Sequence, residues 1–129
     1  RIRKKYICKN QIKKGIGGMK KLISLKKNNY STALMIDQRV SEGISSKFFN
    51  KEALTTTIPA QLTKRFNISV VPIFIERVQD INFKITVNKP LNFSEENSVK
   101  DITDELNKIL EKMVLLKPEQ WIWSHNRWK

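Results

Sequence analysis

Asp37 is the residue whose type and position best suit chemistry in this sequence. It directly follows the apolar run at residues 33–36 (ALMI), a pattern typical of a strand buried on both faces of a parallel sheet. A buried carboxylate is costly unless it is paired, and ligands of open α/β sheets bind at the carboxyl edge of the strands. We therefore predict that Asp37, with Gln38 beside it, orients a basic residue near a reacting group. A role as a cap or turn residue is the alternative.

Charged and aromatic residues at two further places are candidates for binding. Glu76 and Arg77 follow another apolar run, where they either support the same edge or form an ordinary surface ion pair. Phe48 and Phe49 lie in the stretch 39–54, which we predict to be a long loop. Their rings either line an acyl channel or anchor this loop to the core.

Familiar catalytic motifs are missing from the sequence. It contains no glycine-rich phosphate loop, no HExxH and no GxSxG. His125 is the only histidine, and no acidic residue follows it, so the sequence gives it no orienting partner for work as a general base. Cys8 is the only cysteine, which excludes an internal disulfide and a Cys-x-x-Cys metal site.

Basic residues gather at the start of the chain. Residues 1–30 hold eleven of the 25 Lys and Arg and no acidic residue, so this segment carries most of the net charge of +13. Such a segment suits nucleic acid, anionic lipid headgroups or an acidic protein, although solvated lysines in an Ile- and Asn-rich chain are the plain alternative. Only Tyr6 and Tyr30 could stack on bases here, which disfavours nucleic acid.

The end of the chain, PEQWIWSHNRWK, holds Trp121, Trp123 and Trp128 together with two cations. Indoles beside cations suit the headgroup level of a membrane. The same side chains could instead pack under the sheet and close the core. The sequence leaves both interpretations open.

Hydrophobic periodicity predicts an α/β fold. Thr55 or Thr56 is the expected cap of one helix, Pro59 falls in its first turn, and Asn67 ends it. In chain order we predict a helix at 18–27 ended by Asn28-Asn29, a buried strand at 33–36, the loop at 39–54, a helix at 55–66, a buried strand at 69–76, an antiparallel strand at 82–87, and a long helix that begins at Ser94 or Ser98 and ends before Pro118.

Length and hydropathy limit the organisation of the chain. Its 129 residues suffice for one domain or part of one, and no apolar run of about 18 residues could span a bilayer. The start is basic without a following apolar region, so it does not have the pattern of a signal peptide. Because the sequence begins with Arg1 rather than Met, we expect a fragment whose N-terminal part is missing.

Three segments, MIDQ, FFNKEALTTTIPAQLTKRFNISVVPIFIER and PEQWIWSHNRWK, resemble the C-terminal half of the bacterial lipid A biosynthesis lauroyl/myristoyl acyltransferases. The similarity runs across the whole chain and is most specific in the tail. It implies a glycerolipid/lipid A acyltransferase-like α/β fold with a mixed sheet flanked by helices. Residues 1–129 would then be the C-terminal part of a single acyltransferase domain.

The resemblance also implies an activity. These enzymes transfer a fatty acyl chain from an acyl carrier protein thioester to a hydroxyl of an anionic lipid A precursor, in lipopolysaccharide biosynthesis. The resemblance implies the cytoplasmic face of the inner membrane, no metal or other cofactor, and no nucleic acid. A histidine–acid pair that deprotonates the acceptor hydroxyl would lie before Arg1. The alternative is a non-catalytic basic module that binds a membrane surface or nucleic acid.

Two family positions can be carried over as catalytic residues. The aspartate matches Asp37, and an essential arginine matches Arg3, with Arg1 as the rival. We predict that Arg3 holds a lipid phosphate or the thioester oxyanion and that Asp37 positions this cation. The family's Arg-Phe or Arg-Tyr near the end is Arg127-Trp128 here, a small departure. We predict that residues of the basic start, the strand ends, the loop and the tail bind substrate: Arg1, Lys4, Lys5, Gln38, Phe48, Phe49, Arg77, His125 and Arg127.

Overall fold

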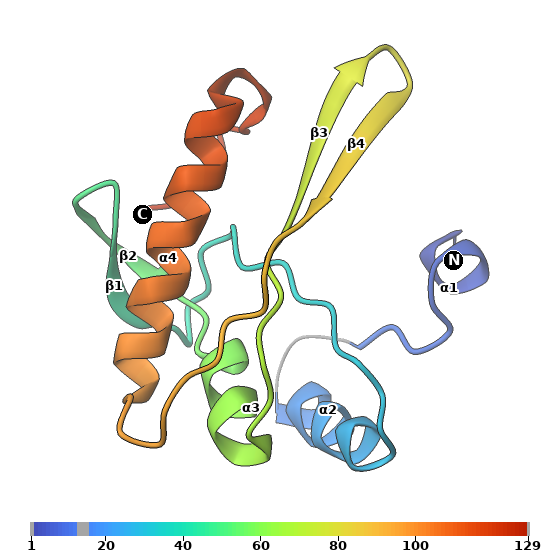
Figure 1. The fold of residues 1–129 in the computed structure, drawn as a ribbon, viewed down its shortest axis with the longest axis vertical. Helices are drawn as coiled ribbons and strands as arrows, with labels where there is room; N and C mark the ends of the chain where they lie inside the picture. Colours follow the sequence, from blue (N-terminus) through green and yellow to red (C-terminus); the bar gives the residue numbers. More distant parts are fainter. Residues whose placement is uncertain (1, 13–15, 129) are drawn as a thin grey trace. The chain divides into compact units, whose positions relative to one another are not determined.

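The computed structural model describes residues 2–12 and 16–128 (Figure 1). The chain forms two compact units, Arg1–Leu34 and Met35–Lys129, and each is described by itself. Helices and small antiparallel sheets make up the structure, which confirms the predicted α/β class. Across the described residues, no helix has the length and apolarity that crossing a bilayer requires.

The first unit contains two helices. α1 spans Ile2–Tyr6, which the sequence pattern did not predict, and α2 spans Ile16–Lys27. The predicted helix at 18–27 is therefore confirmed and begins two residues earlier. It ends where expected, because Asn29 adopts a left-handed conformation with φ 61°.

The predicted strand at 33–36 is wrong. Among the described residues these positions form no strand, and Met35 is 81 % exposed. Four apolar residues were too short a signal, because such a run does not by itself show that a partner strand lies alongside. Asp37 consequently lies in a bend near the start of the second unit, and not at the end of a buried strand.

The predicted loop at 39–54 is also wrong over much of its length, because it contains a hairpin. β1, Ile44–Phe48, pairs antiparallel with β2, Lys51–Thr55, with Phe48 opposite Lys51. Phe49 and Asn50 form the two-residue turn, and both have positive φ (49° and 58°). This conformation suits asparagine but is uncommon for a bulky residue, so the turn lacks the usual glycine signal. Glu111 stabilises it by accepting a 2.6 Å hydrogen bond from the Phe49 backbone N–H.

α3 spans Ile58–Phe66 and confirms the helix predicted at 55–66, with Pro59 in its first turn. Thr55 belongs to β2, so its predicted capping role is wrong. Thr57 precedes the helix without a side-chain cap bond, whereas Thr56 Oγ1 accepts a 3.3 Å hydrogen bond from the Ile58 N–H, as the prediction of Thr56 requires. Asn67 ends the helix as expected: its φ is 46°, and its N–H donates to the carbonyl of Thr63.

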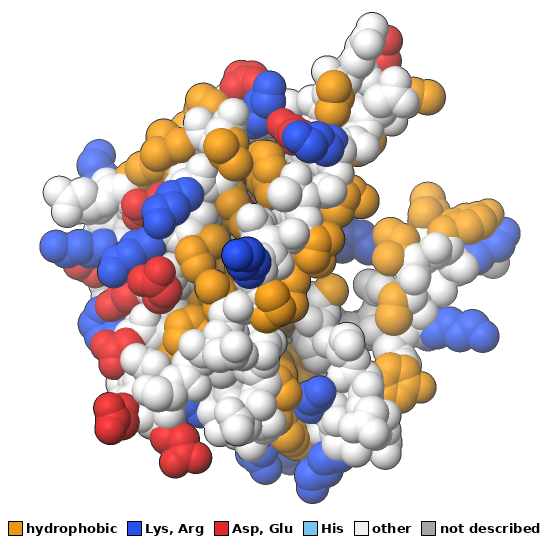
Figure 2. All heavy atoms as spheres, viewed as in Figure 1, with side chains coloured by type: hydrophobic (Ala, Val, Ile, Leu, Met, Phe, Trp, Pro, Cys, Tyr) orange, Lys and Arg blue, Asp and Glu red, His pale blue; other side chains and the backbone are white. Residues whose placement is uncertain are grey.

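A second hairpin forms a long two-stranded ribbon (Figure 1). β3, Ile73–Gln79, pairs antiparallel with β4, Asn82–Val87, which confirms the predicted antiparallel strand. The first of these strands was expected to be buried, but Ile73 and Ile75 are each more than half exposed. Their cross-strand partners on that face, Val87 and Ile85, are exposed as well, and apolar side chains lie at the surface of the ribbon in Figure 2.

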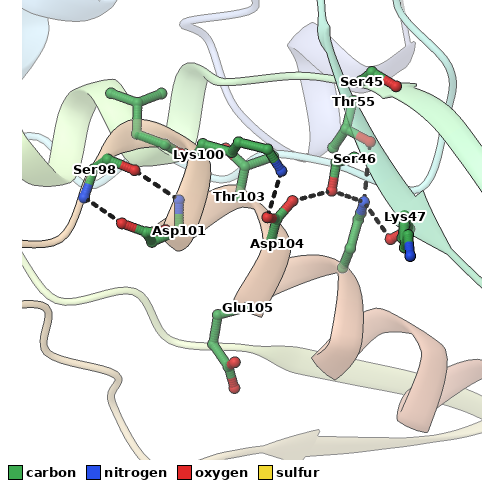
Figure 3. Close-up of polar contacts among 12 residues, drawn as sticks. Ser45, Ser46, Lys47, Thr55, Ser98, Lys100, Asp101, Thr103, Asp104 and Glu105 are labelled. Carbon is green, nitrogen blue, oxygen red and sulfur yellow. Dashed lines mark hydrogen bonds and ion pairs between the residues drawn. The ribbon is translucent and has the colours of Figure 1, made fainter.

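The long helix α4, Val99–Leu116, organises the core of the second unit. Ser98 is its N-cap and forms a capping box with Asp101, so the prediction of Ser98 is confirmed (Figure 3). Ile102 and Leu106 pack with Ala60 of α3, whereas Val114 packs with Phe48 and Ala53 of the first hairpin. The helix ends before Pro118, as predicted, and the short 3-10 helix η1, Pro118–Gln120, begins the tail.

Asp104 connects α4 to β1 and gives the fold an acid-sensitive contact (Figure 3). Its carboxylate accepts hydrogen bonds from Ser46 Oγ (2.7 Å) and Lys100 Nζ (2.6 Å). Burial raises the pKa of Asp104, but these bonds outweigh burial and hold it below the ordinary value of 3.8. A carboxyl with a lowered folded-state pKa contributes stability above its unfolded pKa, and this contribution is lost as the pH falls through the folded pKa.

We therefore expect Asp104→Asn to flatten the acid limb of the stability curve. Urea unfolding between about pH 6 and pH 2 should show a smaller loss of unfolding free energy below about pH 4 than in the unsubstituted chain. Asp80→Asn is the matched control, because the Asp80 side chain makes no hydrogen bond among the described residues. Equal slopes in Asp104→Asn and the unsubstituted chain would contradict this role.

Candidate functional site

Two charged side chains far apart in the sequence, Asp37 and Arg127, lie within electrostatic reach of each other. Asp37 lies in the bend that precedes the first hairpin, and Arg127 lies in the tail that follows η1. Arg127 is fully buried, with a relative exposure of 0 %. Asp37 is half-buried, and its Oδ1 is buried without a hydrogen-bond partner among the described residues. This juxtaposition defines the candidate site.

The backbone of β2 fixes the Arg127 guanidinium. Nη1 donates a 2.8 Å hydrogen bond to the carbonyl of Leu54, and Nη2 donates a 2.8 Å bond to Thr55 Oγ1. The same Leu54 carbonyl accepts a bond from the backbone N–H of Val40 at 3.3 Å. Because one oxygen receives both donors, the guanidinium lies beside the segment that carries Asp37.

Burial and the charge of Asp37 shift the pKa of Arg127 in opposite directions. Burial lowers the pKa of Arg127 from its ordinary value, and the negative charge of Asp37 opposes that change. The guanidinium carbon also lies 5.4 Å from the ring centroid of Phe48, in cation–π range. The site therefore places a buried cation within the electrostatic reach of a carboxylate.

Asn107 of α4 completes the support beneath this cation. Its Nδ2 donates to Ser46 Oγ at 2.8 Å and to Thr55 Oγ1 at 3.1 Å. Thr55 Oγ1 thus accepts from both Asn107 and Arg127 and donates its own hydrogen to the Ala53 carbonyl at 3.1 Å. The sequence reasoning missed Asn107, although a signal was present: this amide occupies a position of α4 that faces the core.

The tail closes over the aromatic end of the first hairpin. Trp121 and Trp128 lie 5.9 and 5.8 Å from Phe48, ring centroid to ring centroid, and Trp128 Nε1 donates to the Phe48 carbonyl at 2.8 Å. Both indoles are half-buried, so they follow the packing interpretation of the tail. Trp123 is 51 % exposed and lies 6.2 Å from Phe49.

The other predicted site residues of the second unit lie at different places. Gln38 is exposed beside Asp37, and Phe48 is fully buried in the core. Arg77 lies on the ribbon, where its Nη1 donates to the Asp80 carbonyl at 2.6 Å. His125 is exposed in the tail.

The predicted residues of the basic start belong to the first unit. Arg3, Lys4 and Lys5 are exposed on α1, and Arg1 lies outside the described residues. The predicted pairing of Arg3 with Asp37 stays a prediction, since each unit is described by itself.

Arg39 is a further cation that the sequence reasoning missed. It is half-buried two residues after Asp37, and its Nε has no hydrogen-bond partner within the described part of the chain. Its position close to the carboxylate in the sequence was the available signal. Among the side chains that the structure describes, no three His, Cys, Asp or Glu residues come together as metal ligands.

Gly43 sets the distance between the segment of Asp37 and β2. A methyl group at this glycine would lie 2.8 Å from the backbone N and 2.7 Å from the backbone C of Thr55. Gly43→Ala should therefore displace β2 and cost about 1–3 kcal/mol of unfolding free energy, the usual cost of overpacking. Chemical denaturation provides the measurement.

Gly17→Ala is the matched control for this substitution. Nothing lies within 4 Å of a methyl group at Gly17, and alanine in α2 should stabilise the helix by at most about 1 kcal/mol. If Gly43→Ala unfolded at the same denaturant concentration as the unsubstituted chain, the close approach to Thr55 would not constrain the site.

Comparison with known proteins identifies the family. No curated protein matches this chain significantly. The sequence family described as "Bacterial lipid A biosynthesis acyltransferase" matches residues 4–129. That range covers most of the basic start, Asp37, the first hairpin, and the tail with Arg127. The chain therefore belongs to the bacterial lipid A biosynthesis acyltransferases.

Proposed function

We propose that this chain takes part in the transfer of a fatty acyl chain from an acyl carrier protein thioester to a hydroxyl of a lipid A precursor. Family membership supports acyl transfer to a lipid A-type acceptor. The observation that carries the proposal within the chain is the buried, unpartnered Oδ1 of Asp37 beside the buried Arg127. A buried carboxylate oxygen without a partner is costly for the fold, and such groups are retained at functional sites.

The proposed roles of the residues are binding and orientation. Asp37 orients a polar group of the substrate at the end of β2, with Gln38 at the exposed side. Arg3, assisted by Lys4 and Lys5, holds acidic groups of the acceptor, because a guanidinium can bind a phosphate through two parallel hydrogen bonds. We assign no proton transfer to His125, since the described residues place no acid against its ring.

We further propose that the protein works at the cytoplasmic face of the inner membrane. The support is the charge of residues 1–30, which carry eleven cations and no acid. Near an anionic surface each Lys or Arg adds about 1 kcal/mol of attraction, which decays within about 8–10 Å at moderate ionic strength.

Asp37→Asn tests the proposed function in the full gene product. Loss of the carboxylate should lower acyl transfer by about 10²-fold, the scale expected when a substrate group is misplaced. The assay follows the acylated product by mass spectrometry, with the acyl carrier protein thioester compared against the matching coenzyme A thioester.

Glu42→Gln is the matched control, because Glu42 is an exposed acid in the same segment. It should retain full activity. Undiminished transfer by Asp37→Asn would remove Asp37 from the site, and equal use of both thioesters would refute the carrier protein as the specific donor.

The membrane proposal is tested by replacing three exposed lysines of α2, Lys20, Lys21 and Lys27, with glutamine. Loss of three charges should weaken binding to vesicles of phosphatidylglycerol and phosphatidylethanolamine by about 10²-fold. Sedimentation with the vesicles measures the binding.

A control variant replaces three exposed lysines of the second unit, Lys51, Lys89 and Lys112. It removes the same charge from outside the basic segment and should weaken binding much less. If both triple variants lost the same affinity, net charge rather than the basic segment would account for the attraction.

A further inference from the structure

We propose that Arg127 of the tail is the positioning residue for Asp37: anchored on β2, it holds the carboxylate in place through its charge. This inference rests on the proposed function of the site and assigns the cationic partner of Asp37 to the end of the chain. The sequence and its resemblance to the family assign that partner to Arg3 instead.

Arg127 has the fixed geometry that a positioning group requires. Its two terminal nitrogens are each engaged at 2.8 Å, by the Leu54 carbonyl and by Thr55 Oγ1. The Phe48 ring lies against the guanidinium in a cation–π contact, and the arginine side chain is fully buried. A planar guanidinium held at two points and against a ring keeps one orientation, so its electric field at Asp37 is also fixed.

Asp37 and Arg127 interact electrostatically but form no direct ion pair. The Leu54 carbonyl joins the guanidinium to the backbone of Val40, three residues after Asp37. The ion pairs with N···O of 4.0 Å or less among the described residues do not include Asp37 with Arg127. Asp37 Oδ1 and Arg127 Nε both remain buried without a partner. The attraction therefore acts without a direct ion pair, at an N···O separation above 4.0 Å, and neither buried atom is satisfied by the other.

Trp128 anchors the end of the tail on the first hairpin. Its Nε1 bond to the Phe48 carbonyl fixes the residue that follows Arg127 in the chain. This bond involves no charge and does not touch Asp37. Trp128→Phe is therefore a variant that loosens the tail while leaving the charge of the pair intact.

The test is a double-mutant cycle between Arg127→Gln and Asp37→Asn in the full gene product, with kcat/KM for acyl transfer as the readout. Arg127→Gln should lower kcat/KM by about 10- to 100-fold when Asp37 is present and by less than about 2-fold when residue 37 is asparagine. Trp128→Phe, which keeps the charge and both 2.8 Å bonds of the guanidinium, should lower it less than Arg127→Gln does when Asp37 is present. Arg127→Lys, which keeps the charge, should retain more activity than Arg127→Gln at a similar loss of thermal stability.

Two results would overturn the inference. One is an equal fold-loss from Arg127→Gln in both backgrounds, which would mean that the arginine acts only on the fold. The other is equal activity of Arg127→Lys and Arg127→Gln, which would mean that its charge does not reach Asp37.

A second readout separates this inference from the proposed function. The same cycle is measured on urea unfolding midpoints, which do not depend on activity. Non-additive midpoints in a protein that transfers no acyl group would support the pair and refute the function. Additive midpoints together with additive kinetics in an active enzyme would refute the pair and leave the function standing.

Discussion

Hydrogen bonds to Leu54 and Thr55 at the end of β2 hold the second unit together. There the Leu54 carbonyl accepts hydrogen bonds from Val40 and Arg127, and the Thr55 hydroxyl accepts from Arg127 and Asn107. Four segments (the bend, the strand, α4 and the tail) thus meet on two adjacent residues. Because the arginine is fully buried, loss of either acceptor would leave a buried donor of a charged group unpaired, which costs more than a neutral hydrogen bond returns.

Local signals in the sequence predicted α2, α3, α4 and the antiparallel strand β4. Ser98 and Asn67 mark helix ends through chemistry that needs no tertiary context, namely a capping box and a left-handed C-cap. The first hairpin escaped prediction because its turn uses Phe49, whose left-handed backbone is held by Glu111 from 62 residues away. A turn that relies on a distant carboxylate has no local sequence signature.

The candidate site was likewise only partly predictable from the sequence. Asp37 and Arg127 could each be singled out by residue type and by resemblance, but nothing in their local patterns brings them together. They come near each other because the Leu54 carbonyl of β2 accepts hydrogen bonds both from Val40, three residues after Asp37, and from Arg127. The wrong strand at 33–36 has the same cause: a short apolar run predicted a sheet edge for Asp37, whereas the structure gives it a bend whose partner comes from the other end of the chain.

The site is built from contacts of long sequence separation. Arg127 and Thr55 are 72 residues apart in sequence, and Trp128 and the Phe48 carbonyl are 80 apart. Closing loops of this length costs conformational entropy, which the packing of α4 on the first hairpin helps to offset. The tail docks on the surface that Phe48, Leu54 and Thr55 present together. The electrostatics of the site are therefore a property of the folded second unit as a whole rather than of any local motif.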